Sequence, residues 1–234
     1  PFDVQLDNQG RIWVSRGTTN PINIFDSIGD GNPQSAPSSG TALAFNSLNS
    51  ELYYWDSDGL INKIDITRTT PIASDTPVGD PSTNEDEVLS ISTFGLTADS
   101  EGYLYFAGLG GDSTTIFKYN PSLSEGNQTP RLAQGPSNID LIIKNNHLYV
   151  TNPQGSSGNL ILKFTKDLEF VDSFGYPTNG TVNSAGAFVQ PSRFLATTSD
   201  KIYVADDNSD TLNAYANRIT SFGDTDGSDW DTYA

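Results

Sequence analysis

Residues 11–14 of the chain read Arg-Ile-Trp-Val, and a stretch of the same type returns four more times. The later copies are Glu-Leu-Tyr-Tyr at 51–54, Tyr-Leu-Tyr-Phe at 103–106, His-Leu-Tyr-Val at 147–150 and Lys-Ile-Tyr-Val at 201–204. Each copy is a short run of aliphatic and aromatic residues, which is typical of a buried or half-buried strand. The copies begin 40, 52, 44 and 54 residues apart. This spacing indicates a repeat protein in which each repeat is one small β-sheet.

Each of these five stretches lies between two further apolar segments, which we expect to be strands as well. The preceding segments end in turn-forming Asn, Asp, Ser or Gly; they are FDVQLD-NQG, TALAFNS-LNS, FGLTAD-SEG, NIDLIIK-NN and SRFLATT-SD. The following segments are PINIFD, LINKIDI, TTIFKYN, NLILKFT and TLNAYA. A fourth strand is predicted for two repeats, as EFVDSFG at 169–175 and RITSFG at 218–223.

Five repeats of three or four antiparallel strands predict an all-β fold, a β-propeller of five blades with four antiparallel strands each. The alternative is six blades, with one degenerate blade within 60–90. We expect residues 1–234 to form this single domain. The aromatic residues of the second strands are expected to pack between blades rather than bind ligand; they are Trp13, Tyr53, Tyr54, Tyr105, Tyr149 and Tyr203.

The composition limits the partners of the chain. Twelve Lys and Arg stand against 29 Asp and Glu, which gives a net charge of −17. Nucleic acid and anionic lipid both bind cationic surfaces, so we predict neither as a partner. No apolar run approaches the roughly 18 residues of a membrane helix, so no membrane span is expected. The surplus of Asp either keeps an exported protein soluble or supplies ligands for Ca²⁺.

The chain has no Cys and no Met. The absence of Cys rules out disulfides and thiol chemistry. Without Met at position 1, the sequence does not begin at a native translation start, and we interpret this as the loss of a leader. An acidic chain rich in Asn, Asp, Ser and Thr and free of Cys fits a bacterial periplasmic or cell-surface protein, which we expect to be a monomer.

Three segments carry a resemblance to a known family: DVQLDNQGRIWVSRG at 3–17, IYVADDNSD at 202–210 and NRITSFGD at 217–224. They resemble the NHL-type repeat. The resemblance implies a β-propeller and leaves the activity open, because related propellers include binding scaffolds, lyases, lactonases and sensor domains. It also implies that the starts of first strands and the ends of second strands share one face, where propellers usually carry their site.

Two sets of polar residues are predicted to surround the centre of that face. The starts of first strands supply Asp3, Asn138 and Arg193, and the ends of second strands supply Arg16, Asp56, Asn152 and Asp206. One hypothesis is a pocket for a charged or hydroxylated ligand. The alternatives are an internal Asp3–Arg193 ion pair and, for Asp206, a carboxylate that caps its own turn. Trp55 and Trp230, which lie near predicted loops, could stack on a ligand.

A run of carboxylates near the end of the chain suggests a metal site: Asp224, Asp226, Asp229 and Asp231 around Gly227. Alternating carboxylates at a glycine bend can converge oxygen ligands on Ca²⁺. The match to a calcium loop is a fragment, because no acidic residue follows at the twelfth position. The alternative is a solvated turn.

The sequence offers no recognisable catalytic group. His147 is the only histidine and opens a strand, so neither a Ser-His-Asp triad nor a histidine metal site is predicted. No Glu lies on a first strand, where a glycosidase pair would be expected. The leading hypothesis is a binding or interaction module for a protein or a small polar or carbohydrate ligand. The alternatives are a metal-assisted hydrolase or lyase using Asp and Asn at the channel mouth, and a structural or sensor domain.

Overall fold

The structure is a computed structural model of the chain. It describes residues 3–27, 29, 31, 33–67, 72–73, 89–90, 95–110, 113–119, 126–128, 133–134, 139–155, 158–177, 187–188, 191–198, 200–206, 218–223 and 230–233. The described residues form 24 strands and no helix, so the all-β prediction is confirmed. In these residues there is accordingly no helix that could cross a membrane. The chain divides into two compact units, Pro1–Gly111 with Ile116–Gln128, and Asp112–Thr115 with Thr129–Ala234.

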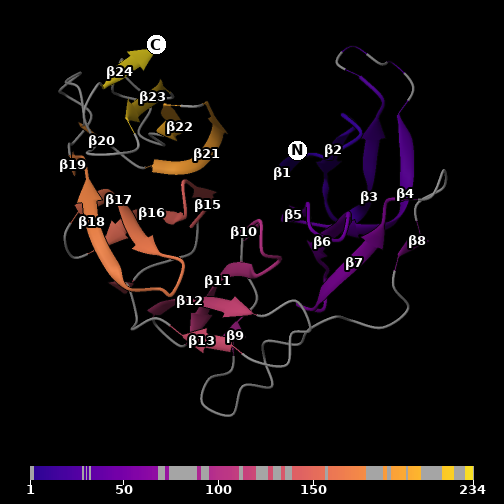
Figure 1. Cartoon of the computed structure of the whole chain (residues 1–234), viewed down its shortest axis with the longest axis horizontal. Coiled ribbons are helices and arrows are strands. Elements are labelled where there is room, and N and C mark those ends of the chain that lie inside the picture. The colour runs from indigo at the N-terminus through magenta and orange to yellow at the C-terminus, as the bar shows by residue number, and fades with distance from the viewer. Residues whose placement is uncertain are drawn as a thin grey trace. The chain divides into compact units, whose positions relative to one another are not determined.

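The first unit contains two complete four-stranded sheets, drawn in indigo and purple in Figure 1. The first sheet consists of β1 (Asp3–Leu6), β2 (Ile12–Ser15), β3 (Gly17–Phe25) and β4 (Gln34–Gly40). The second consists of β5 (Leu43–Asn46), β6 (Glu51–Trp55), β7 (Ile61–Asp65) and β8 (Ile72–Ala73). Each is an antiparallel meander in chain order. This is the arrangement that short strands joined by tight turns produce.

A third sheet has the same meander with two additions. Its path is β10 (Leu96–Ala98), β11 (Leu104–Gly110), β12 (Ser113–Tyr119) and β13 (Gly126–Gln128). The short strand β9 (Leu89–Ser90) pairs with β11, and β14 (Ala133–Gln134) pairs with β12. The strand residues described within 60–90 belong to the second and third sheets, whereas 68–71 and 74–88 lie outside the described residues. The six-blade alternative therefore remains open.

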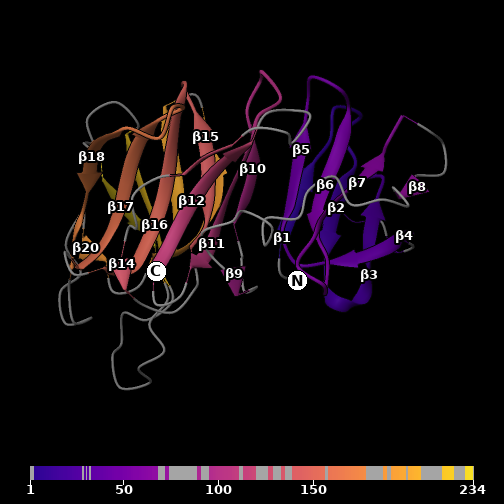
Figure 2. The same ribbon diagram turned by 90° about the horizontal axis from the view of Figure 1, so that it is seen from below.

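The second unit contains two further four-stranded meanders; the strands of the first of them, β15 to β18, run side by side in Figure 2. The fourth sheet consists of β15 (Leu141–Lys144), β16 (His147–Gly155), β17 (Gly158–Thr165) and β18 (Phe170–Phe174). The fifth consists of β21 (Pro191–Thr197), β22 (Lys201–Asp206), β23 (Arg218–Gly223) and β24 (Asp231–Tyr233). A short parallel pair, β19 (Tyr176–Pro177) and β20 (Ala187–Phe188), lies between them in the sequence.

The five predicted signature stretches are the second strands of the five sheets: β2, β6, β11, β16 and β22. EFVDSFG supplies the fourth strand of its sheet, as predicted. The prediction for RITSFG is wrong, because β23 pairs directly with β22 over six residues, from Lys201↔Gly223 to Asp206↔Arg218. It is therefore the third strand, and β24 is the fourth. The segment TLNAYA, predicted as the third strand, lies outside the described residues.

Most aromatic residues of the second strands are buried, as predicted. Trp13 packs with Ile22, Ile24, Leu52 and Ile64 in one cluster of the first unit. Tyr53 and Trp55 join Leu104, Phe106 and Phe117 in another. In the second unit, Tyr149 packs with Ile161, Phe174, Val204 and Phe222. These apolar clusters join neighbouring sheets. The two clusters of the first unit together bury both faces of the second sheet.

The first sheet, by contrast, is buried on one face and open on the other. Register places Val4 opposite Val14, and Leu6 opposite Ile12, which is opposite Phe25. These five side chains therefore share one face. Val4 is 51% exposed and Leu6 is 62% exposed, while Ile12, Val14 and Phe25 are half-buried. We call these five residues the open face of the first sheet.

Candidate functional site

The predicted site residues of the first unit lie at one end of its first two sheets, at the start of β1 and the ends of β2 and β6. Asp3 is paired with Ser15, so Arg16 follows directly at this end. The Asp3 carboxylate accepts hydrogen bonds from Val4 N at 2.7 Å and, through its other oxygen, from Leu43 N at 2.7 Å. The second bond joins the first sheet to the start of β5. Asp3 therefore has a structural role here whether or not it also binds a ligand.

Ser15 strengthens the same junction. Its buried hydroxyl donates to Thr41 O at 2.6 Å, and Thr41 N donates to Trp55 O at 3.0 Å. Arg16, in contrast, is exposed, and its backbone carbonyl accepts a hydrogen bond from Asn20 Nδ2 at 3.4 Å. This end of the two sheets thus combines a hydrogen-bonded junction at Ser15 and Thr41 with the exposed guanidinium of Arg16.

Asp56 uses its carboxylate inside its own turn. One oxygen accepts from Asp58 N and Leu60 N at 2.9 Å each, and the other accepts from Asn62 Nδ2 at 2.5 Å. Gly59 completes the turn with φ of 78°. Asp56 is thus a carboxylate that caps its own turn, which is the alternative that the sequence analysis gave for Asp206.

The same turn occurs at two places that the sequence analysis did not single out. Asp7 Oδ1 accepts from Gln9 N and Arg11 N, and Asp99 Oδ1 accepts from Glu101 N and Tyr103 N, all at 2.9 Å. Gly10 and Gly102 have positive φ, as Gly59 does. We call this arrangement, in which residue i binds the N–H groups of i+2 and i+4, the turn bracket. It closes three-residue hairpin loops whose last residue is left-handed.

The second carboxylate oxygen of each Asp bracket binds the side chain six residues on. Trp13 Nε1 donates to Asp7 Oδ2 at 2.9 Å, and Tyr105 OH donates to Asp99 Oδ2 at 3.1 Å. Asn62 does the same for Asp56. The signal was present in the sequence as the repeated pattern Asp-x-x-Gly with a donor at i+6, read from DNQGRIW, DSDGLIN and DSEGYLY.

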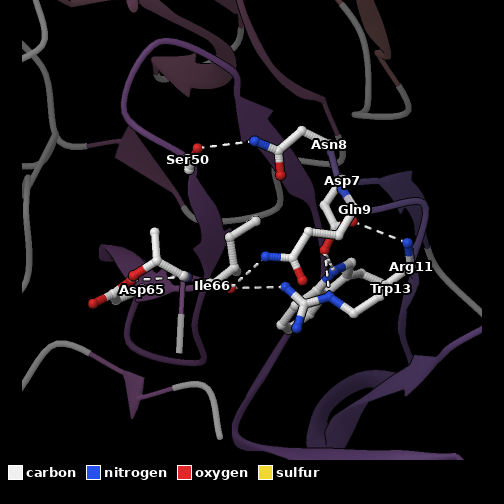
Figure 3. Close-up of polar contacts among 9 residues, drawn as sticks. Asp7, Asn8, Gln9, Arg11, Trp13, Ser50, Asp65 and Ile66 are labelled. Atoms are coloured by element: carbon white, nitrogen blue, oxygen red, sulfur yellow. Dashed lines mark hydrogen bonds and ion pairs between the residues drawn. The ribbon is translucent and has the colours of Figure 1, made fainter. Parts of the chain in front are cut away.

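The Asp7 bracket is extended into a polar cluster that joins the first two sheets (Figure 3). Arg11 Nε binds Asp7 Oδ2 at 2.7 Å, and its terminal nitrogen donates to Ile66 O at 2.9 Å. The Arg11 guanidinium also lies 5.3 Å from the centre of the Trp13 ring. Burial alone raises the pKa of Asp7, but the hydrogen bonds from Trp13, Arg11 and Gln9 outweigh it and hold the pKa below its usual value. The cluster lies at the end of β1 remote from Asp3.

A smaller network surrounds Glu51, at the start of β6. Lys63 Nζ binds Glu51 Oε1 at 2.6 Å, and Tyr53 OH donates to Glu51 Oε2 at 2.7 Å. Burial, with the neighbouring Glu51, raises the pKa of Tyr53 to about 12. The phenol therefore stays protonated and donates to the carboxylate. Glu51 is therefore the anion of an ion pair with Lys63 and the acceptor of the Tyr53 hydrogen bond.

The predicted site residues of the second unit lie at equivalent strand ends. Asn152 is near the end of β16, and Asp206 ends β22 opposite Pro191, the first residue of β21. Both side chains are buried. Asp206 has interaction partners, so its carboxylate is not free. Arg193 pairs in register with Ala205, but its side chain and Asn138 lie outside the described residues.

The predicted metal loop is described only at its end. Asp224, Asp226 and Asp229 lie outside the described residues. The Asp231 carboxylate forms an ion pair with Lys201 Nζ. No group of three or more His, Cys, Asp or Glu in the described part of the chain could hold a metal ion.

The two tryptophans considered as ligand platforms are both parts of apolar clusters. Trp55 is buried and meets the Phe106 ring edge-on at 5.3 Å. Trp230 is half-buried and stacks on Phe222 at 4.9 Å. The His147 side chain bonds within its own turn, where Nδ1–H donates to the carbonyl oxygen of Asn145 at 2.9 Å.

Comparisons with known proteins show the fold only. No protein-family model matches the chain, and no curated protein matches it. The NHL-type resemblance therefore stays a prediction. Among solved structures, the chain is similar to Kuenenia stuttgartiensis hydrazine synthase, with a TM-score of 0.64 and 14% sequence identity over 99% of the chain. The chain spans 65% of the length of that hydrazine synthase chain. This similarity, to a protein that contains a β-propeller, supports a β-propeller-like fold.

Proposed function

We propose that the chain is a five-bladed β-propeller that acts as a binding module through polar residues at the ends of its second strands: Arg16, Asp56, Asn152 and Asp206. One observation carries the proposal: all five sheets follow the same meander order, so the ends of their second strands occupy equivalent positions. Polar groups at equivalent positions of a repeat fold form a common face in a propeller. Convergent polar groups on such a face are the usual means of recognising a ligand.

The proposal includes the class of ligand. The ends of the second strands offer an exposed guanidinium at Arg16 in the first unit, and buried amide and carboxylate groups at Asn152 and Asp206 in the second. Such a mixture suits a ligand that is rich in hydroxyl groups, because a hydroxyl accepts from a guanidinium or amide and donates to a carboxylate; a carbohydrate or a polar protein segment is such a ligand. With a net charge of −17, the chain is suited to an extracellular or periplasmic setting, where we propose that it acts as a monomer.

The test is binding of the labelled chain to an array of neutral and acidic oligosaccharides and of acetylated peptides. Arg16→Glu is expected to weaken binding to the positive probes by about fivefold or more, roughly 1 kcal/mol, because it reverses an accessible charge on the proposed face. The matched control is Lys166→Glu, in the β17–β18 hairpin at the other end of its sheet, which is expected to leave binding unchanged. Equal losses in the two variants, or no probe bound by the wild type, would refute the proposed face.

We also propose Ca²⁺ as a ligand of Asp224, Asp226, Asp229 and Asp231. Support comes from the alternation of carboxylates around Gly227, since Ca²⁺ takes six to eight oxygen ligands and accepts varied coordination geometry. Because Asp231 is paired with Lys201, binding through Asp231 would have to displace Lys201.

The expected result for calcium is a melting temperature that is higher in millimolar Ca²⁺ than in EDTA, since a ligand bound only to the folded state stabilises it. Asp226→Asn should abolish this difference, while Asp58→Asn, in an exposed turn, should preserve it. Identical melting curves of the wild type in Ca²⁺ and EDTA would leave the loop as a solvated turn.

A further inference from the structure

No further inference is drawn: the strongest candidate, the exposed Phe170 and Val171 on the edge strand β18, is a small apolar patch, and nothing in the part of the chain that the structure describes shows what covers it.

Discussion

At the scale of single residues, Asp7 is a buried carboxylate with four hydrogen-bond donors around it. Its side chain is fully buried and accepts hydrogen bonds from Gln9 N, from Arg11 N and Nε, and from Trp13 Nε1. A buried carboxylate is costly unless its lone pairs are satisfied, and here they are. The Asp7 cluster therefore stabilises the charged form of Asp7 and, through Arg11, the junction between the first two sheets.

This arrangement predicts an acid-dependent loss of stability. The pKa of Asp7 is lowered in the folded protein, so its contribution is fully present above the unfolded pKa, near 4, and is lost as the pH falls through the lower folded value. Asp7→Asn should destabilise the chain by about 2–4 kcal/mol at pH 7, because it leaves the Arg11 charge without its partner. Urea unfolding of both proteins between pH 7 and pH 2.5 measures the difference.

The gap between wild type and Asp7→Asn should narrow below about pH 4, as the wild-type carboxylate becomes protonated. Asp58→Asn is the control, because Asp58 is exposed in its turn and should change stability by no more than about 0.5 kcal/mol. A gap of constant size down to pH 2.5 would mean that the charge of Asp7 contributes nothing.

Trp13 and Trp55 show how much of this detail a sequence conceals. Both are buried aromatic residues of second strands, but Trp13 Nε1 binds Asp7, whereas Trp55 Nε1 is buried with no partner among the described residues. Sequence alone places Trp55 near a loop, because Asp56 begins the next turn. Its side chain instead points into the apolar cluster, because strand alternation puts Trp55 on the same face as Tyr53.

At the scale of elements, the turn bracket explains why so many hairpins form from such different strands. It joins first to second strands at Asp7 and Asp99, and second to third strands at Asp56. A fourth example, between β17 and β18, uses Thr165, whose hydroxyl accepts from Asp167 N at 3.3 Å and Glu169 N at 3.1 Å. Here Leu168 takes the left-handed position with φ of 65°. The bracket tolerates this strain for a non-glycine residue.

Substitution by alanine is predicted to have opposite effects at two glycines that have open space around them, one inside a bracket and one outside. Gly10 has φ of 80°, and a Cβ there would meet nothing within 4 Å, so Gly10→Ala should cost about 1–2 kcal/mol through backbone strain alone. A Cβ at Gly31 is equally free, and its φ lies outside the left-handed region. Gly31→Ala should therefore be neutral or stabilise the chain by up to about 1 kcal/mol. Thermal and urea unfolding of the two variants compare them directly, and equal effects would contradict the strain argument.

The strands and their order within a sheet were predictable for the first four sheets, and the order failed in the fifth. Alternation and turn residues marked the second strand of every sheet, because burial on a pleated surface requires those residue types. RITSFG was misplaced because TLNAYA, a similar apolar segment, precedes it. The bracket at Thr165 escaped detection because Thr and Leu replace Asp and Gly in its sequence. For the candidate site, the sequence predicted which strand ends carry polar residues but not their hydrogen-bond partners. The bond from Leu43 N to the Asp3 carboxylate, for example, depends on packing between sheets.

At the scale of the whole molecule, the propeller proposal requires that both faces of the first and the fifth sheet be covered. A blade in a closed propeller has a neighbour on each face. The first sheet has the open face described above, and the fifth sheet has Tyr203 and Ala205 half-buried beside Ile219, which is 40% exposed. In a closed five-bladed ring both faces are expected to be covered.

Leu6 and Leu48 provide a matched test, because each is 62% exposed in the described structure. Leu6 belongs to the open face of the first sheet, whereas Leu48 lies in the β5–β6 turn. If the ring closes, Leu6→Asp should lower the free energy of unfolding by about 2–4 kcal/mol, since it would place a charge in an apolar contact. Leu48→Asp should change it by about 0.5 kcal/mol or less.

The mass in solution separates the ways in which this face could be covered. A monomer that is destabilised by Leu6→Asp supports a closed five-bladed ring. A dimer that Leu6→Asp converts to a monomer would show a second copy on this face. Equal tolerance of both substitutions would contradict closure with five blades and leave the face open to solvent.

The turn bracket also bears on the history of the chain. Each Asp bracket takes the backbone and side-chain donors described above from seven consecutive residues, from the carboxylate to the donor at i+6. Such a seven-residue unit can close a hairpin loop wherever it is copied, and it requires no matching change elsewhere in the protein. A gene segment that encodes it can be duplicated while its strands diverge in sequence. The brackets at Asp7 and Asp99, which close the same loop of the first and third sheets, are the expected product of that process.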